Sequence, residues 1–408
     1  MKQGGNRLFN NNITLIKMAI SCDILVVGAG PAGSSAARAA AMGGAKTILI
    51  EKDPAAGMNI QCAESISKYL MPYLPFPIPK EQLIWEMRGM RFWAEGITIE
   101  RTGEQWQGYN INREKFDKWL VDEAVKAGTK FLTSTKLVDL DFNDDYIVKK
   151  AHVKTPKGEK EIKPKIVIGA DGVKSTVARR LGVRKVRKGD IGELIAYDMR
   201  NLNLEHPHYD QIFFGDFAPG SYAYIMPKSR NVASVGVGTT IEENKRELER
   251  HFEEFIKLDI VKEQLKNRVI MDEKSGEAPV GYLTDKWIYG NVILTGDAAN
   301  QNIKPFVEGI IPGIVCGEIA GRIASNTRSR YMDEEEYRQM VYTKLPQFRE
   351  SDRMIDIIRS EGFRPHDTKR HLLHLGLCAE IFSTQEIIDL KETEYEVIMK
   401  RIERHLQK

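Results

Sequence analysis

The residues with the clearest chemical meaning form a glycine-rich segment near the N-terminus, Gly28-Ala29-Gly30-Pro31-Ala32-Gly33, with Glu51 eighteen residues after its last glycine. In this spacing the first glycine permits a tight turn, the second lets the backbone approach a pyrophosphate, and the third lets a helix pack closely against a strand. A carboxylate at the position of Glu51 can accept hydrogen bonds from ribose hydroxyls. The segment therefore predicts a dinucleotide site; the simpler alternative is an ordinary strand–helix–strand unit with a glycine-rich turn.

The elements that would position this segment can be read on both sides of it. The apolar residues 24–27 predict a buried strand, the small residues 34–41 predict a helix, and residues 47–50 predict a second strand that ends at Glu51. The N-terminus of such a helix presents free N–H groups and the positive end of the helix dipole to phosphates.

Two later apolar segments also run into small-residue turns that carry a carboxylate. Residues 166–168 lead into Gly169-Ala170-Asp171-Gly172, and residues 292–295 lead into Gly296-Asp297-Ala298-Ala299. Both patterns read as buried strands, and each turn is a candidate part of the same site.

The composition indicates a soluble globular protein of two or three domains. The chain has 408 residues, of which 42% are hydrophobic and 29% are charged. A net charge of +3 is too small to indicate nucleic-acid binding. The four cysteines include no Cys-x-x-Cys pair, so neither a zinc site nor an iron–sulfur cluster is expected, and a reducing cytosol is the expected location. No apolar run of about 18 residues predicts a membrane span.

Patterns along the chain change character several times. Residues 85–101 and 190–240 alternate apolar and polar residues, which predicts strands of an antiparallel sheet. Residues 109–127 have helical spacing, and residues 331–408 are charged and helical in pattern. Residues 1–17 are polar and carry no signal-peptide pattern; they are expected to be a disordered extension, or to precede a natural start at Met18.

Four signatures together resemble the FAD-dependent fold of p-hydroxybenzoate hydroxylase, in that family's order. They are the glycine segment with Glu51, the Arg113-x-x-Phe116-Asp117-x-x-Leu120 segment, the Ala170-Asp171-Gly172 turn, and Gly296-Asp297-Ala298-Ala299 followed by Pro305 and Gly309. The resemblance implies an α/β fold: a Rossmann-like FAD-binding domain, an inserted antiparallel-sheet substrate domain and a C-terminal helical region. The expected bounds are 18–84, 102–185 and 281–325 for the FAD domain, 85–101 and 186–280 for the substrate domain, and 326–408 for the helical region.

The same resemblance implies particular contacts with FAD. Arg113 is expected to contact the cofactor chain, Asp297 to accept hydrogen bonds from the ribityl hydroxyls, and the N–H groups of Gly309 and Ile310 to face the flavin pyrimidine. Asp171 either contacts a ligand or supports its own turn. The implied cofactor-binding residues are Gly28, Gly30, Ala32, Gly33, Glu51, Lys52, Cys62, Ala63, Arg113, Val138, Asp297, Gly309 and Ile310.

Within that fold, two local features resemble the geranylgeranyl reductases, especially the archaeal digeranylgeranylglycerophospholipid reductases. One is Cys62-Ala63-Glu64, and the other is the segment 219–228, which is similar to the family's Tyr-x-Trp-x-Phe-Pro-Lys element. Tyr224 stands at the Trp position and Met226 at the Phe position. Both replacements keep a large apolar body, so a contact with an isoprenoid chain is expected, with an altered pocket shape. A core strand with aromatic faces is the alternative reading.

The activity that this resemblance implies is saturation of isolated C=C bonds in geranylgeranyl chains of membrane-lipid precursors. Such an alkene needs a hydride from the reduced flavin and a proton on its other carbon, in a dry apolar tunnel. Cys62, Tyr222 and Tyr224 are the implied catalytic residues, with the Cys62 thiol as a proton source. A buried structural cysteine is the alternative for Cys62. The sequence leaves open whether Cys316 lies near it.

The expected partners are an isoprenoid glycerophospholipid substrate and a reduced electron carrier such as a ferredoxin. Only one glycine fingerprint is present, so no second dinucleotide domain is evident. The basic residues between Arg179 and Lys188 predict peripheral contact with an anionic membrane surface, unless they form a solvated face. The alternatives for function are an NAD(P)H-dependent flavin monooxygenase and an electron-transfer flavoprotein dehydrogenase.

Overall fold

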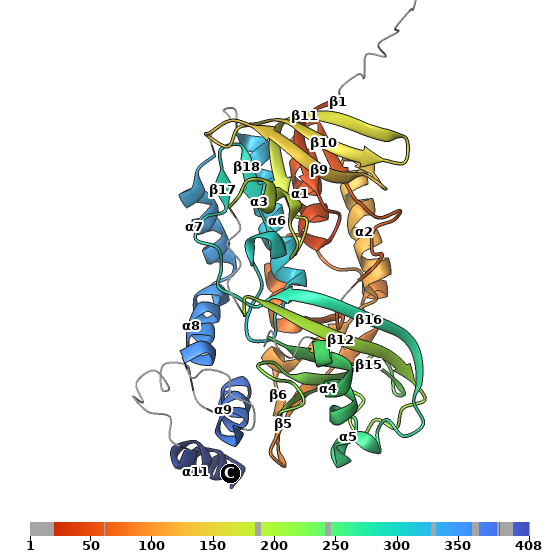
Figure 1. The fold of residues 1–408 in the computed structure, drawn as a ribbon, viewed down its shortest axis with the longest axis vertical. Helices are drawn as coiled ribbons and strands as arrows, with labels where there is room; N and C mark the ends of the chain where they lie inside the picture. Colours follow the sequence, from red (N-terminus) through yellow and green to blue (C-terminus); the bar gives the residue numbers. More distant parts are fainter. Residues whose placement is uncertain are drawn as a thin grey trace, which may run out of the picture.

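The computed structural model describes residues 20–60, 62–183, 189–240, 246–327, 332–360, 367–381, 383 and 395–407. The predicted extension, residues 1–17, lies outside the described residues. The chain builds two large sheets, one in the upper and one in the lower half of Figure 1, and its C-terminal helices run along one side. No helix among the described residues is both long and apolar enough to cross a membrane.

The upper sheet is the predicted dinucleotide-binding unit. Its strand order is β17-β18-β11-β1-β2-β8, and the pairs from β18 to β8 are all parallel. Two further strands, β9 and β10, extend it by antiparallel pairing onto β11. The strands are β1 (Ile20–Val27), β2 (Thr47–Ile50), β8 (Lys130–Leu132), β9 (Lys136–Phe142), β10 (Val148–Thr155), β11 (Gly158–Gly169), β17 (Ile288–Tyr289) and β18 (Val292–Leu294).

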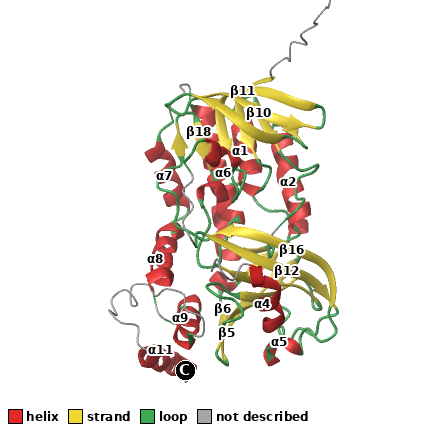
Figure 2. Cartoon of the chain, in the orientation of Figure 1, coloured by secondary structure: helices red, strands yellow, loops and turns green. Residues whose placement is uncertain are grey.

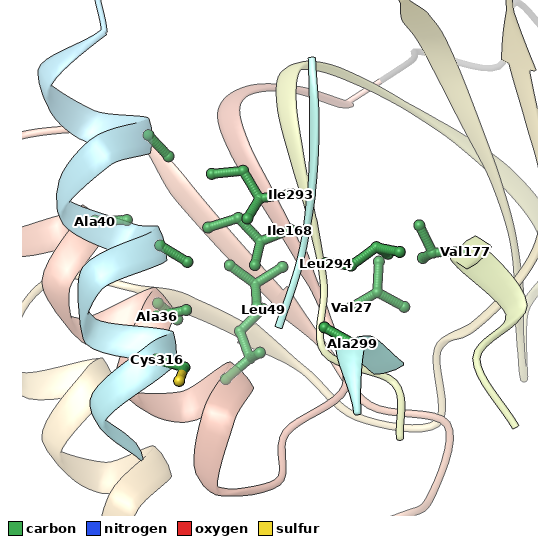
Figure 3. Packing of buried hydrophobic residues seen from close by; sticks show 14 of the residues in the cluster. Val27, Ala36, Ala40, Leu49, Ile168, Val177, Ile293, Leu294, Ala299 and Cys316 are labelled. Atoms are coloured by element: carbon green, nitrogen blue, oxygen red, sulfur yellow. The ribbon is translucent and has the colours of Figure 1, made fainter. Parts of the chain in front are cut away.

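Two helices pack closely together over this sheet, α1 (Pro31–Met42) and α6 (Ile310–Asn326). A Cβ on Gly317 would lie 2.1 Å from the carbonyl oxygen of Ala32, so only glycine permits this approach. Figure 3 shows the core beneath them, where aliphatic side chains of the sheet, such as Leu49 of β2 and Ile168 of β11, lie next to the alanines of α1. Each fully buried side chain of this size contributes roughly 1.5–3 kcal/mol.

A helix and a small sheet follow the second strand. The three-stranded sheet has the order β3 (Ser65–Ser67), β7 (Gly108–Asn110), β4 (Trp85–Met87). The helix predicted over residues 109–127 begins later, at Arg113, because β7 occupies residues 108–110. Asn112 caps this helix, α2 (Arg113–Lys126), by accepting the Lys115 N–H at 2.9 Å.

The lower sheet has seven strands in the order β16-β12-β15-β14-β13-β5-β6. All pairs are antiparallel, as predicted, except β13 with β5, which is parallel. The difference arises because β5 enters the sheet from the other domain and no hairpin joins it to β13. The strands are β5 (Gly89–Ala94), β6 (Ile97–Thr102), β12 (Ile191–Arg200), β13 (Tyr209–Phe214), β14 (Ala223–Pro227), β15 (Val232–Thr239) and β16 (Val269–Pro279).

Successive side chains of β13 and β14 are buried on opposite faces of this sheet. Phe213 and Ile225 pack with α4 (Leu248–Phe255), and α5 (Asp259–Lys262) follows on that side. Ile212, Phe214, Tyr224 and Met226 pack on the other face, against α9 (Thr368–Cys378).

The C-terminal region is helical, as predicted, and Figure 2 shows it descending from the upper sheet to the lower one. The helix α9 contacts β5 and β13, and α11 packs on α9. The helices are α7 (Glu334–Lys344), α8 (Gln347–Ser360), α9 (Thr368–Cys378) and α11 (Tyr395–Leu406).

Candidate functional site

The glycine turn after β1 leaves an open helix N-terminus. Gly28 has φ +98°, and a Cβ there would lie 2.5 Å from the carbonyl oxygen of Ala170, so glycine is required. A Cβ on Gly30, in contrast, would meet no atom within 4 Å. No side chain caps the first turn of α1. Free N–H groups beside open space suit a pyrophosphate.

Glu51 ties the end of β2 to this turn. Its Oε2 accepts the Ala29 N–H at 2.8 Å, and its Oε1 accepts the Asp53 N–H at 3.0 Å. The carboxylate therefore lies at the edge of the glycine turn, where the sequence places the ribose. The neighbouring Lys52 is exposed, and its ammonium group pairs with Asp53 at 3.0 Å.

The turn that carries Asp297 meets the same helix N-terminus. A Cβ on Gly296 would lie 2.8 Å from the Cβ of Ala32, and one on Gly309 would lie 3.3 Å from Oδ1 of Asp297. Asn302 Nδ2 donates to that oxygen at 3.4 Å. Segments far apart in the sequence thus converge on Ala32, which is the convergence that a single extended cofactor needs.

Asp171 stabilises its own turn through hydrogen bonds to the residues that follow it. Its carboxylate accepts hydrogen bonds from Ser175 Oγ at 2.6 Å and from the N–H groups of Thr176 and Val177 at 2.6 and 3.1 Å. These groups open the helix α3 (Thr176–Arg180). Of the two readings of Asp171 from the sequence, the structure favours support of the turn. Val138, another predicted contact, uses its carbonyl to accept from Arg180 Nε at 2.9 Å.

Arg113 lies beside Cys62. Its Nε and Nη2 donate to the two carboxylate oxygens of Asp117, both at 2.8 Å. Burial disfavours the charge on Arg113, but the Asp117 carboxylate and a hydrogen bond with the Cys62 side chain outweigh it and raise the pKa of Arg113. Arg113 therefore holds the start of α2 next to the Cys62 segment.

A cavity of about 280 Å³ lies between this segment and the lower sheet. Six of the predicted site residues line it: Cys62, Ala63, Tyr222, Tyr224, Gly309 and Ile310. Its apolar lining comes from β5, β13, β14, α8 and α9 and includes Met90, Ile212, Phe214, Met226, Met354 and Leu377. Gly309 and Ile310, which the resemblance expects to face the flavin, thus line the same cavity as these apolar side chains.

Aromatic side chains form one wall of the cavity. Tyr222 donates its hydroxyl to the Phe306 carbonyl at 3.1 Å, and the ring centroids of Tyr222 and Tyr224 are 6.4 Å apart. Burial raises the pKa of both tyrosines, so their hydroxyls stay neutral. A Cβ on Gly236 would lie 2.6 Å from the Tyr224 ring, so this glycine makes room for it.

A buried ionic cluster lies at the end of β14, the strand that carries Tyr224. Lys228 and Lys274 each contact both Glu64 and Asp198, at 2.8 to 2.9 Å. Burial opposes ionisation of Asp198, but the two lysines outweigh it and lower the pKa of that carboxyl. Glu64 also has φ +66°, and its N–H donates to Cys62 Sγ at 3.2 Å.

Comparison with known proteins identifies the family. A family model described as an FAD binding domain matches residues 79–304, and another of the same description matches residues 23–71. The digeranylgeranylglycerophospholipid reductase of Methanocaldococcus jannaschii is 36% identical over 289 residues, which cover 70% of this chain and 72% of that protein. The chain belongs to the digeranylgeranylglycerophospholipid reductase family.

Further relatives of this reductase family agree. The protein of the same name from Methanococcus aeolicus is 34% identical over 70% of this chain and 72% of its own length. A solved structure of a geranylgeranyl bacteriochlorophyll reductase-like protein from Thermoplasma acidophilum superimposes with a TM-score of 0.71 at 26% identity, covering 94% of this chain and 96% of that one. The predicted family, fold class and FAD cofactor are thereby confirmed.

Several residues of the cavity lining were not found from the sequence. Asp210 and Glu308 are buried acids in its lining, and His374 and Cys378 reach it from α9. One feature of the sequence could have indicated Asp210. Side chains alternate along a strand, so Asp210 lies on the same face of β13 as Ile212 and Phe214.

Cys316, which the sequence could not place relative to Cys62, lies in the core of α6 and is not among the cavity-lining residues. Burial alone raises the pKa of its thiol.

Proposed function

We propose that this protein is an FAD-dependent reductase that saturates the C=C bonds of geranylgeranyl chains in glycerophospholipid precursors. The observation that carries the proposal is that one cavity is lined by Cys62, Tyr222, Tyr224, Gly309 and Ile310 together. The names of the relatives support the substrate class.

The chain's own residues meet the needs of an isolated alkene. Bound FAD, once reduced, supplies the hydride. The side chains of Met226, Ile212 and Leu377 give the isoprenoid chain an apolar surface, at about 0.8 kcal/mol per buried methylene. The proton must come from a group in the cavity lining, and Cys62, the predicted source, is one such group.

We also propose a reduced carrier of the ferredoxin type as electron donor, and a cytoplasmic protein in peripheral contact with the membrane that holds its substrate. Residues 184–188 of the predicted basic patch lie outside the described residues. Arg179 and Arg180, which are described, have exposed guanidinium groups, although Arg180 contacts Asp139 at 3.5 Å. Stronger binding to anionic than to neutral liposomes in flotation would support the contact, and equal binding would remove the patch from the proposal.

One experiment separates the reductase from a monooxygenase of the same fold. Chemically reduced enzyme is incubated without oxygen with a digeranylgeranyl glycerophospholipid, and the product mass is measured. A gain of two hydrogens per double bond is expected. A gain of one oxygen in air with NAD(P)H, and no hydrogenation without oxygen, would establish the monooxygenase. Reduction of a quinone without lipid turnover would favour the electron-transfer dehydrogenase.

A further inference from the structure

Two buried acids face the cavity close to the predicted flavin loop. Glu308 directly precedes Gly309, and Asp210 begins the cavity face of β13. Beyond Asp210 the same face continues with Ile212 and Phe214. An apolar chain lying along β13 would therefore bring one of its double bonds past Asp210.

The short strand β3 holds both acids in place. Ser65 Oγ donates to Asp210 Oδ2 at 3.0 Å, and Ser67 Oγ bonds to Glu308 Oε2. Tyr69 donates to the other oxygen of Glu308 at 3.4 Å. Because Ser65 and Ser67 are two residues apart on one strand, they point to the same face and set the two carboxyl groups side by side.

One carboxyl oxygen of Asp210 accepts no hydrogen bond from the part of the chain that the structure describes. Its Oδ1 is buried and has no hydrogen-bond partner among the described residues, and the residue as a whole is only 6% exposed. A buried, unpaired carboxylate oxygen would cost several kcal/mol, whereas a protonated oxygen carries a hydrogen that can be given to a substrate.

We propose that Asp210 is a catalytic residue, the acid that protonates the alkene carbon opposite the one that receives the hydride. This inference rests on the proposed reductase function. The π bond breaks and two C–H bonds form, one with the hydride from reduced FAD and one with the proton of Asp210. The FAD is oxidised, the alkene is reduced, and the Asp210 carboxylate regains its proton from water after the product leaves.

The electrostatics of the cavity agree with this role. Burial raises the pKa of Asp210 to about 7, against the Ser65 hydrogen bond and with the help of the neighbouring Glu308. A general acid works best with a pKa near the operating pH. Cys62 Sγ, in contrast, is occupied as a hydrogen-bond acceptor by the Glu64 N–H and lies beside the Arg113 guanidinium.

Three other ionisable groups in the cavity lining fit the role less well than Asp210. Glu64 is paired with two lysines, and Lys304 Nζ donates to the carbonyls of Asn300 and Asn302. Burial lowers the pKa of His374 to about 3, with His371 and Arg370 adding to the effect, so the His374 imidazole is neutral rather than an acidic imidazolium. The remaining ionisable lining groups are Cys62, Glu193, Tyr222, Tyr224, Glu308 and Cys378.

The test follows oxidation of the reduced holoenzyme by a digeranylgeranyl glycerophospholipid in a single anaerobic turnover. For the native protein we expect a rate constant that is flat below pH 7 and falls about tenfold per pH unit above it. Asp210→Asn should lose at least about 10²-fold while it keeps FAD and its melting temperature. Asp272→Asn, which removes an exposed acid from the same sheet, is the matched control.

Two milder variants guard against a folding defect. Ser65→Ala removes the hydrogen bond that lowers the pKa of Asp210, so the falling limb should move to higher pH. Glu308→Gln removes the neighbouring negative charge, so the limb should move to lower pH. A merely structural role for Asp210 would not produce opposite shifts.

A second readout needs no turnover. Infrared spectra of the oxidised protein without substrate should show a protonated-carboxyl band that titrates near pH 7 and is absent from Asp210→Asn. Identical spectra for the two proteins, or Asp210→Asn turning over at the native rate with the native pH profile, would overturn the assignment whatever the substrate. Failure of the native protein to hydrogenate any alkene, with the band present, would refute the reductase function and with it this role.

Discussion

Lys228 Nζ lies 2.8 Å from Glu64 Oε2, and both side chains are nearly buried. This pair joins the two segments that resemble the geranylgeranyl reductases, Cys62-Ala63-Glu64 and the strand that ends at Pro227, across 164 residues of sequence. Because Glu64 also donates its N–H to Cys62 Sγ, the ion pair fixes the cysteine relative to the aromatic wall.

Replacing Lys228 by methionine should destabilise the protein. Removing one partner of a buried ion pair leaves a charge uncompensated, which costs about 3–5 kcal/mol. Lys274 remains as a partner of Glu64 and Asp198, so the lower end of that range is expected. Denaturant unfolding measures the change. The control, Lys118→Met, breaks an exposed pair with Asp122 and should cost less than about 1 kcal/mol; equal losses would show that the buried cluster adds nothing.

The same cluster should shape the acid limb of stability. The pKa of Asp198 is lowered in the folded state, so its contribution is complete above the unfolded pKa of about 3.9 and is lost as pH falls through the folded value. Unfolding free energies of the native protein and of Asp198→Asn should therefore converge toward low pH. Parallel curves down to the acid transition would contradict the shift.

At alkaline pH the same cluster should lose stability as pH rises, rather than as it falls. The pKa of Lys274 is raised by Asp198 and Glu64 against burial, so its stabilising effect is present below the unfolded pKa of about 10.4 and is lost only as pH rises through the folded value.

Glu51→Gln should weaken FAD binding by about 1–3 kcal/mol, the range for a charge-assisted hydrogen bond. The structure adds a reason, because the substitution also replaces one acceptor of the Ala29 and Asp53 N–H groups with an amide. Titration of the apoprotein with FAD measures the effect, with the exposed Glu81→Gln as control. An unchanged affinity would remove Glu51 from the cofactor site.

How far the sequence predicts this molecule depends on the range of the interactions involved. The glycine turn and the two carboxylate turns were readable because each is local, and with the Arg113 segment they indicated the FAD-binding fold and the cofactor. Cys62-Ala63-Glu64 and the segment 219–228, which are also local, indicated the reductase family. Asp210 and Glu308 could not be found in this way, since their proximity depends on β3, whose Ser65 and Ser67 hydrogen-bond to the two acids. The parallel pairing of β13 with β5 and the entry of α9 into the cavity wall depend likewise on contacts between distant segments.

Cys62→Ser should keep FAD and alter the alkene half-reaction. If Asp210 is the acid, the loss should stay below about tenfold, because the serine still accepts the Glu64 N–H. Rapid-mixing measurements of the reduced enzyme with lipid give the rate constant, and the visible spectrum checks FAD. A rate loss as large as that of Asp210→Asn would instead indicate that the Cys62 thiol is the proton donor.

Tyr224 and Gly236 should set which lipids fit. Tyr224→Ala opens the aromatic wall, so it should impair turnover of the full two-chain lipid more than that of a short isoprenoid substrate, through lost chain contacts. Gly236→Ala keeps the Tyr224 ring but displaces it, because the added Cβ would lie 2.6 Å from the ring. Since the ring lines the cavity, Gly236→Ala should narrow it and raise KM for the two-chain lipid with little change for the short one. Ratios of kcat/KM for the two substrates measure selectivity, and Tyr224→Phe, which keeps the ring, controls for the hydroxyl. If Tyr224→Ala and Gly236→Ala both keep the native ratio, this wall does not contact the chain.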